Sequence, residues 1–251
     1  MHILLTNDDG INAPGIQALW QELSALGTVS VVAPTSEKSA SSQAITVHHP
    51  IRVDRHCLDN PGICAWRVDG TPTDCVKLAV EALLPEPPDV VVSGINQGPN
   101  LGTDVLYSGT VSAAIEAALF NIPAVAVSLD SWKSDAFLPA ARFARRLVET
   151  VLKQQLPPNT LLNVNVPDLA EPDLKGVSIT KLGVRLYENT FDQRTDPRGR
   201  SYYWMGGSVV DNENDPDSDI TAVKQGKISV TPIHFDLTNY RIMDMIKQWQ
   251  L

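Results

Sequence analysis

Two adjacent carboxylates stand near the start of the chain, in the segment Asn7-Asp8-Asp9-Gly10. The segment directly follows an apolar run at 3–5 that predicts a strand, so both aspartates are expected at its carboxyl end, where open α/β sheets bind ligands. Neighbouring side chains of a regular strand point to opposite faces, so both carboxylates reach one ion only where the chain bends, as Gly10 permits. Carboxylates favour Mg²⁺, Mn²⁺ or Ca²⁺ over zinc. An ordinary turn is the alternative, because these residue types are also common in turns.

A second segment, 93–102, is rich in glycine and asparagine and follows the apolar run 90–92, so it is expected at the same edge of the sheet. Asn96 and Asn100 offer neutral oxygens to a metal or hydrogen bonds to a substrate, and Gly98 allows backbone amides to face an anion. The segment matches neither the dinucleotide-binding pattern G-x-G-x-x-G nor the P-loop. An ordinary glycine-rich loop is the alternative.

The residues that begin a predicted helix at 109–119 are suited to holding phosphate. Ser108, Gly109 and Thr110 place two hydroxyls and several unpaired amides where the helix dipole favours an anion. Capping of the helix by a hydroxyl is the alternative, and the two roles can coexist. The serine-rich segment 33–42 also begins at a strand end, so Ser39 is a candidate to complete a metal site, with a flexible loop as the alternative.

Short apolar runs alternate with helical periodicity over the first two thirds of the chain, which predicts an α/β fold with a mostly parallel sheet flanked by helices. Strands are expected at about 2–6, 28–33, 89–93, 122–128 and 160–166. Helices are expected from Gly15, from a capping sequence at 71–74, at about 109–119 and at about 136–152.

The same patterns divide the chain into three parts. A catalytic core is expected at 1–181, a β-rich arm at 182–235 and a terminal amphipathic helix at 236–251 that returns to the core. The arm is expected from the aromatic cluster at 202–204 and the loops around it, and the helix from apolar residues at helical spacing after Thr238, its expected cap.

Charge and cysteine usage exclude several classes of function. A formal net charge of −9 argues against a broad basic surface for a nucleic-acid polymer, although a bound cation still permits a small phosphate ester. Cys57, Cys64 and Cys75 lack the spacing of a zinc site or a disulfide framework, which fits a cytoplasmic protein. The chain opens on a strand-like run without the features of a secretion signal, and no apolar stretch approaches a membrane span, so no membrane partner is expected.

Two other patterns argue against particular chemistry. Acidic residues alternate over 211–219, but Pro216 replaces the glycine that a calcium loop requires, so a solvated acidic loop is expected. The pattern Gly-x-Ser-x-Gly is absent, which excludes a hydrolase built on a nucleophile elbow.

The chain strongly resembles the SurE survival-protein family nearly end to end. The motifs that carry the resemblance occur in order and are Asn7–Gly10, Ala13–Gly15, the Ser39 segment, Gly70–Cys75, Ser93–Gly102, Tyr107–Val111 and Ser229–Pro232. The resemblance implies a Rossmann-like core and a metal-dependent nucleotidase that acts on nucleoside 5′-monophosphates and often 3′-monophosphates, sometimes with polyphosphatase activity.

The resemblance also implies a metal site and an assembly. Asp8, Asp9, Ser39 and Asn96 match the family's metal ligands, which implies one divalent ion per subunit, Mg²⁺ or Mn²⁺, with Ca²⁺ also accommodated. Family members are homodimers or homotetramers that exchange the C-terminal arm between subunits. Ala40 stands where the family often has glycine, which is expected to stiffen the loop.

We expect the ion to polarise the phosphoryl group and to activate a water for attack, while the residues at 108–110 hold the non-bridging oxygens. Asn7 is expected to orient Asp8 or the substrate. In a second mechanism Asp8 is the nucleophile and forms an aspartyl-phosphate, which the adjacency of the two aspartates disfavours because such phosphatases use D-x-D.

A different class of function is a regulator that binds nucleoside monophosphates without hydrolysing them. Paired carboxylates favour catalysis over binding alone, because they repel phosphate unless a cation intervenes. Tyr187, Tyr202 and Trp204 of the expected arm are candidates for stacking on a nucleobase.

Overall fold

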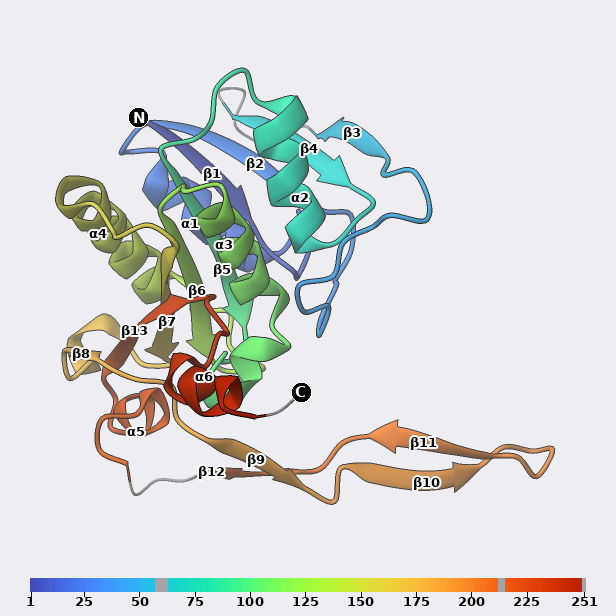
Figure 1. Ribbon diagram of the computed structural model, residues 1–251. Helices are drawn as coiled ribbons and strands as arrows, with labels where there is room; N and C mark the ends of the chain where they lie inside the picture. The colour runs from blue at the N-terminus through green and yellow to red at the C-terminus, as the bar shows by residue number, and fades with distance from the viewer. Residues whose placement is uncertain (57–62, 212–214, 250–251) are drawn as a thin grey trace.

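The computed structural model describes residues 1–56, 63–211 and 215–249. In this part of the chain one sheet of nine strands forms the centre of the molecule, in the order β3-β4-β2-β1-β5-β6-β7-β13-β8 (Figure 1). The strands are β1 His2–Thr6, β2 Thr28–Pro34, β3 Val53–His56, β4 Cys64–Val68, β5 Val90–Gln97, β6 Ala124–Asp130, β7 Thr160–Pro167, β8 Val177–Ile179 and β13 Ile228–His234. Paired neighbours run parallel except β3 with β4 and β7 with β13, which confirms a mostly parallel sheet.

The five strands expected from apolar runs are β1, β2, β5, β6 and β7, and each agrees with its expected range to within a few residues. Their burial explains why the runs were recognisable, since β5 and β7 are buried almost throughout, as strands covered on both faces must be. The short strands β3, β4 and β8 were not expected. β3 and β8 have only four and three residues, and β4, although apolar at four of its five positions, is nearly as short.

Helices cover both faces of the sheet. Their bounds are α1 Pro14–Leu23, α2 Pro72–Leu78, α3 Gly109–Leu119, α4 Leu138–Gln154, α5 Asp219–Lys224 and α6 Tyr240–Lys247, with shorter turns η1 Ala79–Leu83, η2 Gly102–Leu106 and η3 Glu171–Asp173. Buried residues of α1 and α4 share one apolar cluster with the sheet, and those of α2 and α3 share the other. The predicted capping sequence is confirmed, because Thr71 Oγ1 accepts from Asp74 N at 3.1 Å and Asp74 Oδ2 accepts from Thr71 N at 2.9 Å.

The arm consists of β9 Arg185–Glu188, β10 Phe191–Thr195, β11 Ser201–Met205 and β12 Ser208–Asp211. The strands pair as two antiparallel ribbons, β9 with β12 and β10 with β11, which reach away from the body (Figure 1). Large apolar side chains of this arm are exposed, including Phe191 at 62% and Trp204 at 61%. Within the described chain nothing covers them.

The range 182–235 expected for the arm is too long, because β13 and α5 lie in the body. β13 pairs with the open edge of β7, and its residues Ile228 and Val230 join the apolar cluster on the α1 side of the sheet. An apolar strand gains more from completing a buried sheet than from an exposed ribbon, because both its backbone and its side chains find partners there.

The terminal helix α6 begins at Tyr240 after an Asn239 cap, one residue later than the cap expected at Thr238. No described residue of α6 is buried, so the apolar stripe of this helix does not enter the core of its own chain. No helix within the described ranges is both long enough and apolar enough to cross a membrane. Of the cysteines, Cys64 and Cys75 are free thiols, and Cys57 lies outside the described residues.

Candidate functional site

The loops that carry the predicted site residues meet where β1, β2 and β5 end. The Lys38 amide after β2 donates to the Asp8 carbonyl oxygen at 2.8 Å. The Gln97 amide at the end of β5 donates to Asp9 Oδ2 at 3.2 Å. Two segments far apart in the sequence therefore contact the turn that carries the aspartates, as the shared direction of the three strands requires.

Asn7 closes the turn that carries the aspartates. Its Nδ2 donates to the Gly10 carbonyl oxygen at 2.9 Å, and its Oδ1 accepts from the Gly10 amide at 3.2 Å. Gly10 has a φ of +102°, a conformation that glycine adopts without strain. Both polar ends of the Asn7 side chain are thus used within the turn, so this side chain holds the turn that carries Asp8 and Asp9.

Asp8 is 5% exposed and faces the first turn of α3. Thr110 Oγ1 donates to Asp8 Oδ1 at 2.5 Å. A Cβ on Gly109 would lie 2.9 Å from Asp8 Cβ and 3.0 Å from Asp8 Oδ2, so the carboxyl group packs directly on the Gly109 backbone. The expected phosphate seat, defined as Ser108, Gly109 and Thr110, therefore lies against the first of the paired carboxylates.

The electrostatics of this pair favour a cation. Burial raises the pKa of Asp8, against the hydroxyl and amide of Thr110, which lower it. Burial, together with the neighbouring charge of Asp8, raises the pKa of Asp9 to about 6. One buried and one half-buried carboxylate that resist ionisation together are stabilised in their charged form by a nearby positive charge.

Oxygen donors around the pair suit a hard cation. Asn96 is buried and its Nδ2 donates to the Gly98 carbonyl oxygen at 2.7 Å, which fixes the amide and leaves Oδ1 without a hydrogen-bond donor among the described residues. Ser39 Oγ donates to Glu37 Oε1 at 2.5 Å. The described residues include no cluster of three or more His, Cys, Asp or Glu side chains suited to a metal. A cation at Asp8 and Asp9 would therefore need neutral oxygen ligands as well, which Mg²⁺ and Mn²⁺ accept.

The serine-rich loop adopts a strained backbone where it passes the site. Ala40 has a φ of +53° and Ser42 a φ of +51°, in the left-handed region that favours glycine. The loop is nevertheless fastened to the segment before α3, since Ser42 N donates to the Tyr107 carbonyl oxygen at 3.1 Å and Ser42 Oγ to that of Leu106 at 2.7 Å. Alanine at 40 thus occupies a position that suits glycine, and the loop keeps its place.

Ser41 brings an unassigned hydroxyl to the same place. Its Oγ is buried without a hydrogen-bond partner in the described chain and lies 2.9 Å from the position of a Cβ on Gly109. Ser108 Oγ, in contrast, accepts from the Val111 amide at 3.1 Å and caps α3, so the capping role expected as an alternative is present. The phosphate seat therefore consists of the capped start of α3 with the Ser41 hydroxyl beside it, which has no hydrogen-bond partner in the described chain.

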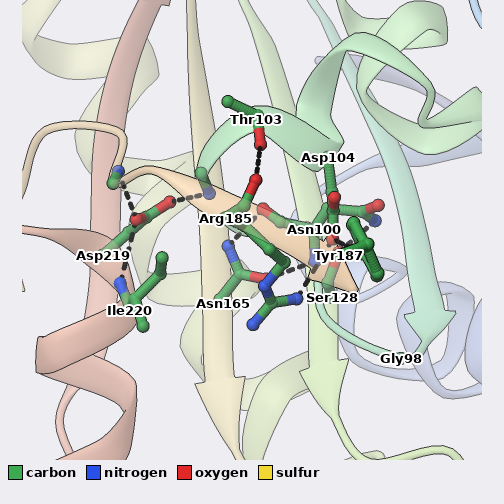
Figure 2. A network of polar contacts seen from close by, with 12 residues as sticks. Gly98, Asn100, Thr103, Asp104, Ser128, Asn165, Arg185, Tyr187, Asp219 and Ile220 are labelled. Carbon is green, nitrogen blue, oxygen red and sulfur yellow. Dashed lines mark hydrogen bonds and ion pairs between the residues drawn. The ribbon is translucent and has the colours of Figure 1, made fainter. Parts of the chain in front are cut away.

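Gly98 and Asn100 shape their loop. Asn100 is clamped by three polar side chains from β6 and β7. Its backbone amide donates to Asn165 Oδ1 at 2.8 Å, and its Nδ2 donates to Ser128 Oγ at 2.8 Å (Figure 2). Its carbonyl oxygen accepts from Asn163 Nδ2 at 2.9 Å. Gly98 has a φ of +116°, and the ring of Trp132 packs on it. The structure therefore gives Asn100 a role in holding the loop.

Asn163, Asn165 and Ser128 were not expected to serve the site. The signal that could have found them is the polar residue at every second position of an otherwise apolar strand, Asn163 and Asn165 in β7. On a buried strand such a pair requires polar partners, and here the partner is the Asn100 backbone.

The acidic run at 211–219 ends in a buried carboxylate, so the expectation of a solvated loop is wrong for Asp219. This side chain is fully buried, and Asp219 Oδ2 accepts from Gly102 N and Oδ1 from Gly183 N, each at 2.8 Å (Figure 2). Backbone donors replace the water that the charge would otherwise require.

The arm aromatics occupy different places. Tyr187 OH donates to Asp104 Oδ2 at 2.6 Å, and burial together with this contact raises the pKa of Tyr187 to about 12. Tyr202 and Trp204 lie on β11, in the outer ribbon of the arm (Figure 1). Stacking of these rings on a nucleobase stays a prediction.

A cavity of about 360 Å³ opens beside Asp9, within the range of small-molecule sites. Its lining residues are Asp9, Gly10, Asn12, Ala13, Pro14, Gly15, Thr35, Glu37, Gln97 and Phe137. The space allows a ligand that contacts the carboxylates to extend past them.

Several known proteins are similar to this chain in sequence and in fold. The family model described as Survival protein SurE matches residues 3–189. The 5′-nucleotidase SurE of Heliobacterium modesticaldum is 55% identical over 249 residues, which cover 99% of this chain and 92% of that protein. The protein of the same name from Carboxydothermus hydrogenoformans is 54% identical over 253 residues, with 99% and 96% covered. The crystal structure of the SurE protein from Aquifex aeolicus matches with a TM-score of 0.85 at 39% identity, covering 98% of each chain.

Proposed function

The chain belongs to the SurE family of survival proteins, and we propose that it is a 5′-nucleotidase that uses one divalent cation, Mg²⁺ or Mn²⁺, per subunit. The substrates are nucleoside 5′-monophosphates, with 3′-monophosphates and short polyphosphate as further substrates, and the reaction takes place in the cytoplasm. The observation that carries the proposal is the contact of Asp8 with both Gly109 and Thr110, which brings a carboxylate to an anion seat. Carboxylate and phosphate repel each other, so this arrangement is useful only with a cation between them.

The reaction transfers the phosphoryl group to water. A water oxygen forms a bond to phosphorus, the bond from phosphorus to the nucleoside oxygen breaks, and that oxygen leaves with a proton, which gives nucleoside and inorganic phosphate. Asp8, Asp9, Asn96 and Ser39 would hold the cation, which when bound supplies positive charge next to the phosphoryl group and favours ionisation of water.

The amides at the start of α3 face the position of the phosphoryl oxygens, where negative charge is stabilised during transfer. Thr110 holds Asp8 in place through its hydroxyl. Asn7 fixes the turn, and the clamp on Asn100 fixes the loop that carries Asn96. The cavity beside Asp9 has room for the nucleoside.

The direct test is phosphate release from the four common nucleoside 5′-monophosphates, 3′-AMP and tripolyphosphate, each with Mg²⁺ or Mn²⁺. We expect release from every 5′-monophosphate with at least one of the metals. Saturable nucleotide binding without release would instead support a regulator.

Gly109→Ala should reduce kcat by about 100-fold, because the added Cβ would push the seat away from Asp8 and misplacement of about 1 Å costs that much. Alanine is favoured over glycine in helices by up to about 1 kcal/mol, so the fold should not suffer from propensity. Steady-state kinetics and a urea unfolding curve separate the two effects. The matched control is Gly206→Ala, since a Cβ there meets nothing within 4 Å. Equal kcat for Gly109→Ala and wild type would show that the seat does not depend on this contact.

We propose that the chain assembles through its arm as a homodimer or homotetramer. The exposed side chains Phe191 and Trp204 support this, as isolated ribbons with apolar faces need a partner. Replacing both with serine should raise the dissociation constant about 100-fold or more, because burying each ring contributes roughly 1.5–3 kcal/mol. Sedimentation velocity over a concentration series measures this shift. Trp132→Ser, at a body residue 73% exposed, is the control and should leave the assembly unchanged.

A further inference from the structure

The Asp219 carboxylate links two segments of the chain, η2 and the residues just before the arm. Asp219 Oδ2 accepts from Gly102 N, the first residue of η2, and Oδ1 accepts from Gly183 N, just before the arm begins. Its own helix contributes a third donor, Ile220 N, at 2.9 Å from Oδ1. Three backbone amides on one fully buried carboxylate leave little freedom to any of the three segments (Figure 2).

The packing around this carboxylate is equally close. A Cβ on Gly102 would lie 2.9 Å from the Gly183 carbonyl oxygen, so the two glycine backbones are in contact. Gly102 has a φ of +55°, which any larger residue adopts only with strain. A Cβ on Gly183 would lie 2.7 Å from Ile220 Cδ1. The site loop, the root of the arm and α5 therefore meet with no spare space.

The rest of η2 is held by the first arm strand. Arg185 pairs with Asp104 at 3.1 Å, with both side chains largely buried at 10% and 18% exposure. Tyr187 donates to the same carboxylate, and Thr103 Oγ1 donates to the Arg185 carbonyl oxygen at 2.7 Å (Figure 2). Consecutive residues of η2 are thus fixed to β9 or to Asp219.

η2 leads directly into the phosphate seat. It ends at Leu106, two residues before Ser108. The carbonyl groups of Leu106 and of Tyr107, the next residue, accept the hydrogen bonds of Ser42 from the serine-rich loop. A displacement of η2 consequently moves both the amides at the start of α3 and the loop that carries Ser39 and Ser41.

We infer that Asp219 is a positioning residue for the phosphate seat, which it holds in register with Asp8 by tying η2 to the root of the arm. The inference rests on the proposed function for its kinetic consequence. Asp219 touches no reacting atom. Its role is to keep the amides at the start of α3 where negative charge develops in the transition state. Loss of this positioning should slow the chemical step and leave substrate binding nearly unchanged.

The test compares Asp219→Asn with wild type in the full-length protein. The amide has almost the same shape, but its N–H group must face at least one of the three backbone donors, so one end of the clamp opens. We expect kcat for AMP to fall about 10- to 100-fold while KM changes less than about 3-fold, measured well below the unfolding temperature of each protein. Asp217→Asn is the matched control, because Asp217 is exposed only two residues away, and it should behave as wild type.

A second variant reaches the same contact from the other side. Gly102→Ala should give the same loss in kcat, and the double variant should lose little more than either single one, because both open one contact. If Asp219→Asn lowers only the unfolding temperature and leaves kcat unchanged, or if the two losses multiply, the positioning role is refuted.

Amide hydrogen exchange provides a readout that does not require turnover. In Asp219→Asn, peptides covering 100–110 and 183–188 should exchange faster, and peptides of β1 and β2 should not change. Unchanged exchange at 100–110 would overturn the inference even if activity fell. If wild type releases no phosphate, the proposed function fails, while the exchange data still decide whether the clamp holds the seat.

Discussion

Asp8→Asn should lower kcat for AMP by about 10³-fold or more, the largest effect expected of any single substitution. The carboxylate is expected to hold the cation, and a cation at a transferring phosphoryl group contributes several kcal/mol, with each 1.36 kcal/mol worth a factor of ten. Asparagine keeps the shape and can still accept the Thr110 hydrogen bond at Oδ1. The loss should therefore come from charge, with no loss of folding stability.

Three measurements make this result specific. Asp168→Asn, the same change at an exposed aspartate after β7, should retain wild-type kinetics. Titration calorimetry with Mn²⁺ should show weaker binding to Asp8→Asn. A phosphorylated Asp8 trapped during turnover by wild type would favour the aspartyl-phosphate mechanism, and wild-type kcat in Asp8→Asn would exclude both routes.

Removal of divalent cations should abolish phosphate release to the background rate of the assay. The pKa of Asp9 is raised to about 6 by burial and by Asp8, so the chain alone presents a poorly compensated negative site to a negatively charged substrate. Dialysis against a chelator followed by stepwise addition of Mg²⁺ or Mn²⁺ measures both loss and recovery. Ca²⁺ should compete for the site.

The control for chelation is the unfolding temperature of the dialysed protein, which should fall only by the small amount that loss of a ligand explains. Activity should return when Mg²⁺ or Mn²⁺ is added and not when the chelator alone is removed. Full activity in the dialysed protein, with metal content verified by elemental analysis, would rule out a cation at Asp8 and Asp9.

Sequence alone sufficed for the frame of the site. β1 and β5 are apolar runs long enough to be recognised, and polar segments that follow parallel strands must meet at one edge of the sheet. This rule predicts that the aspartates lie near Asn96 and near the phosphate seat. The details of each contact, such as Thr110 on Asp8, depend on side-chain directions that strand order does not fix.

The contacts that support the site could not be inferred from local sequence. Asp219 stands in an acidic run that looks solvated, and its partner Gly102 lies 117 positions earlier in the chain. Only the meeting of η2, the arm root and α5 makes that carboxylate buried and useful. The position of β13 was missed for a similar reason, since its partner is the free edge of β7 and nothing nearby in the sequence specifies it.

The exposed arm also affects the life of a newly made chain. Before the proposed assembly forms, each copy carries two narrow ribbons with unpaired strand edges and exposed aromatic rings, which are the features that promote aggregation. The rate at which two copies meet rises with the square of the chain concentration. Slow synthesis would thus prolong the lifetime of the lone subunit, and fast synthesis would multiply faulty pairings, so yield in the cell should peak at an intermediate rate of expression.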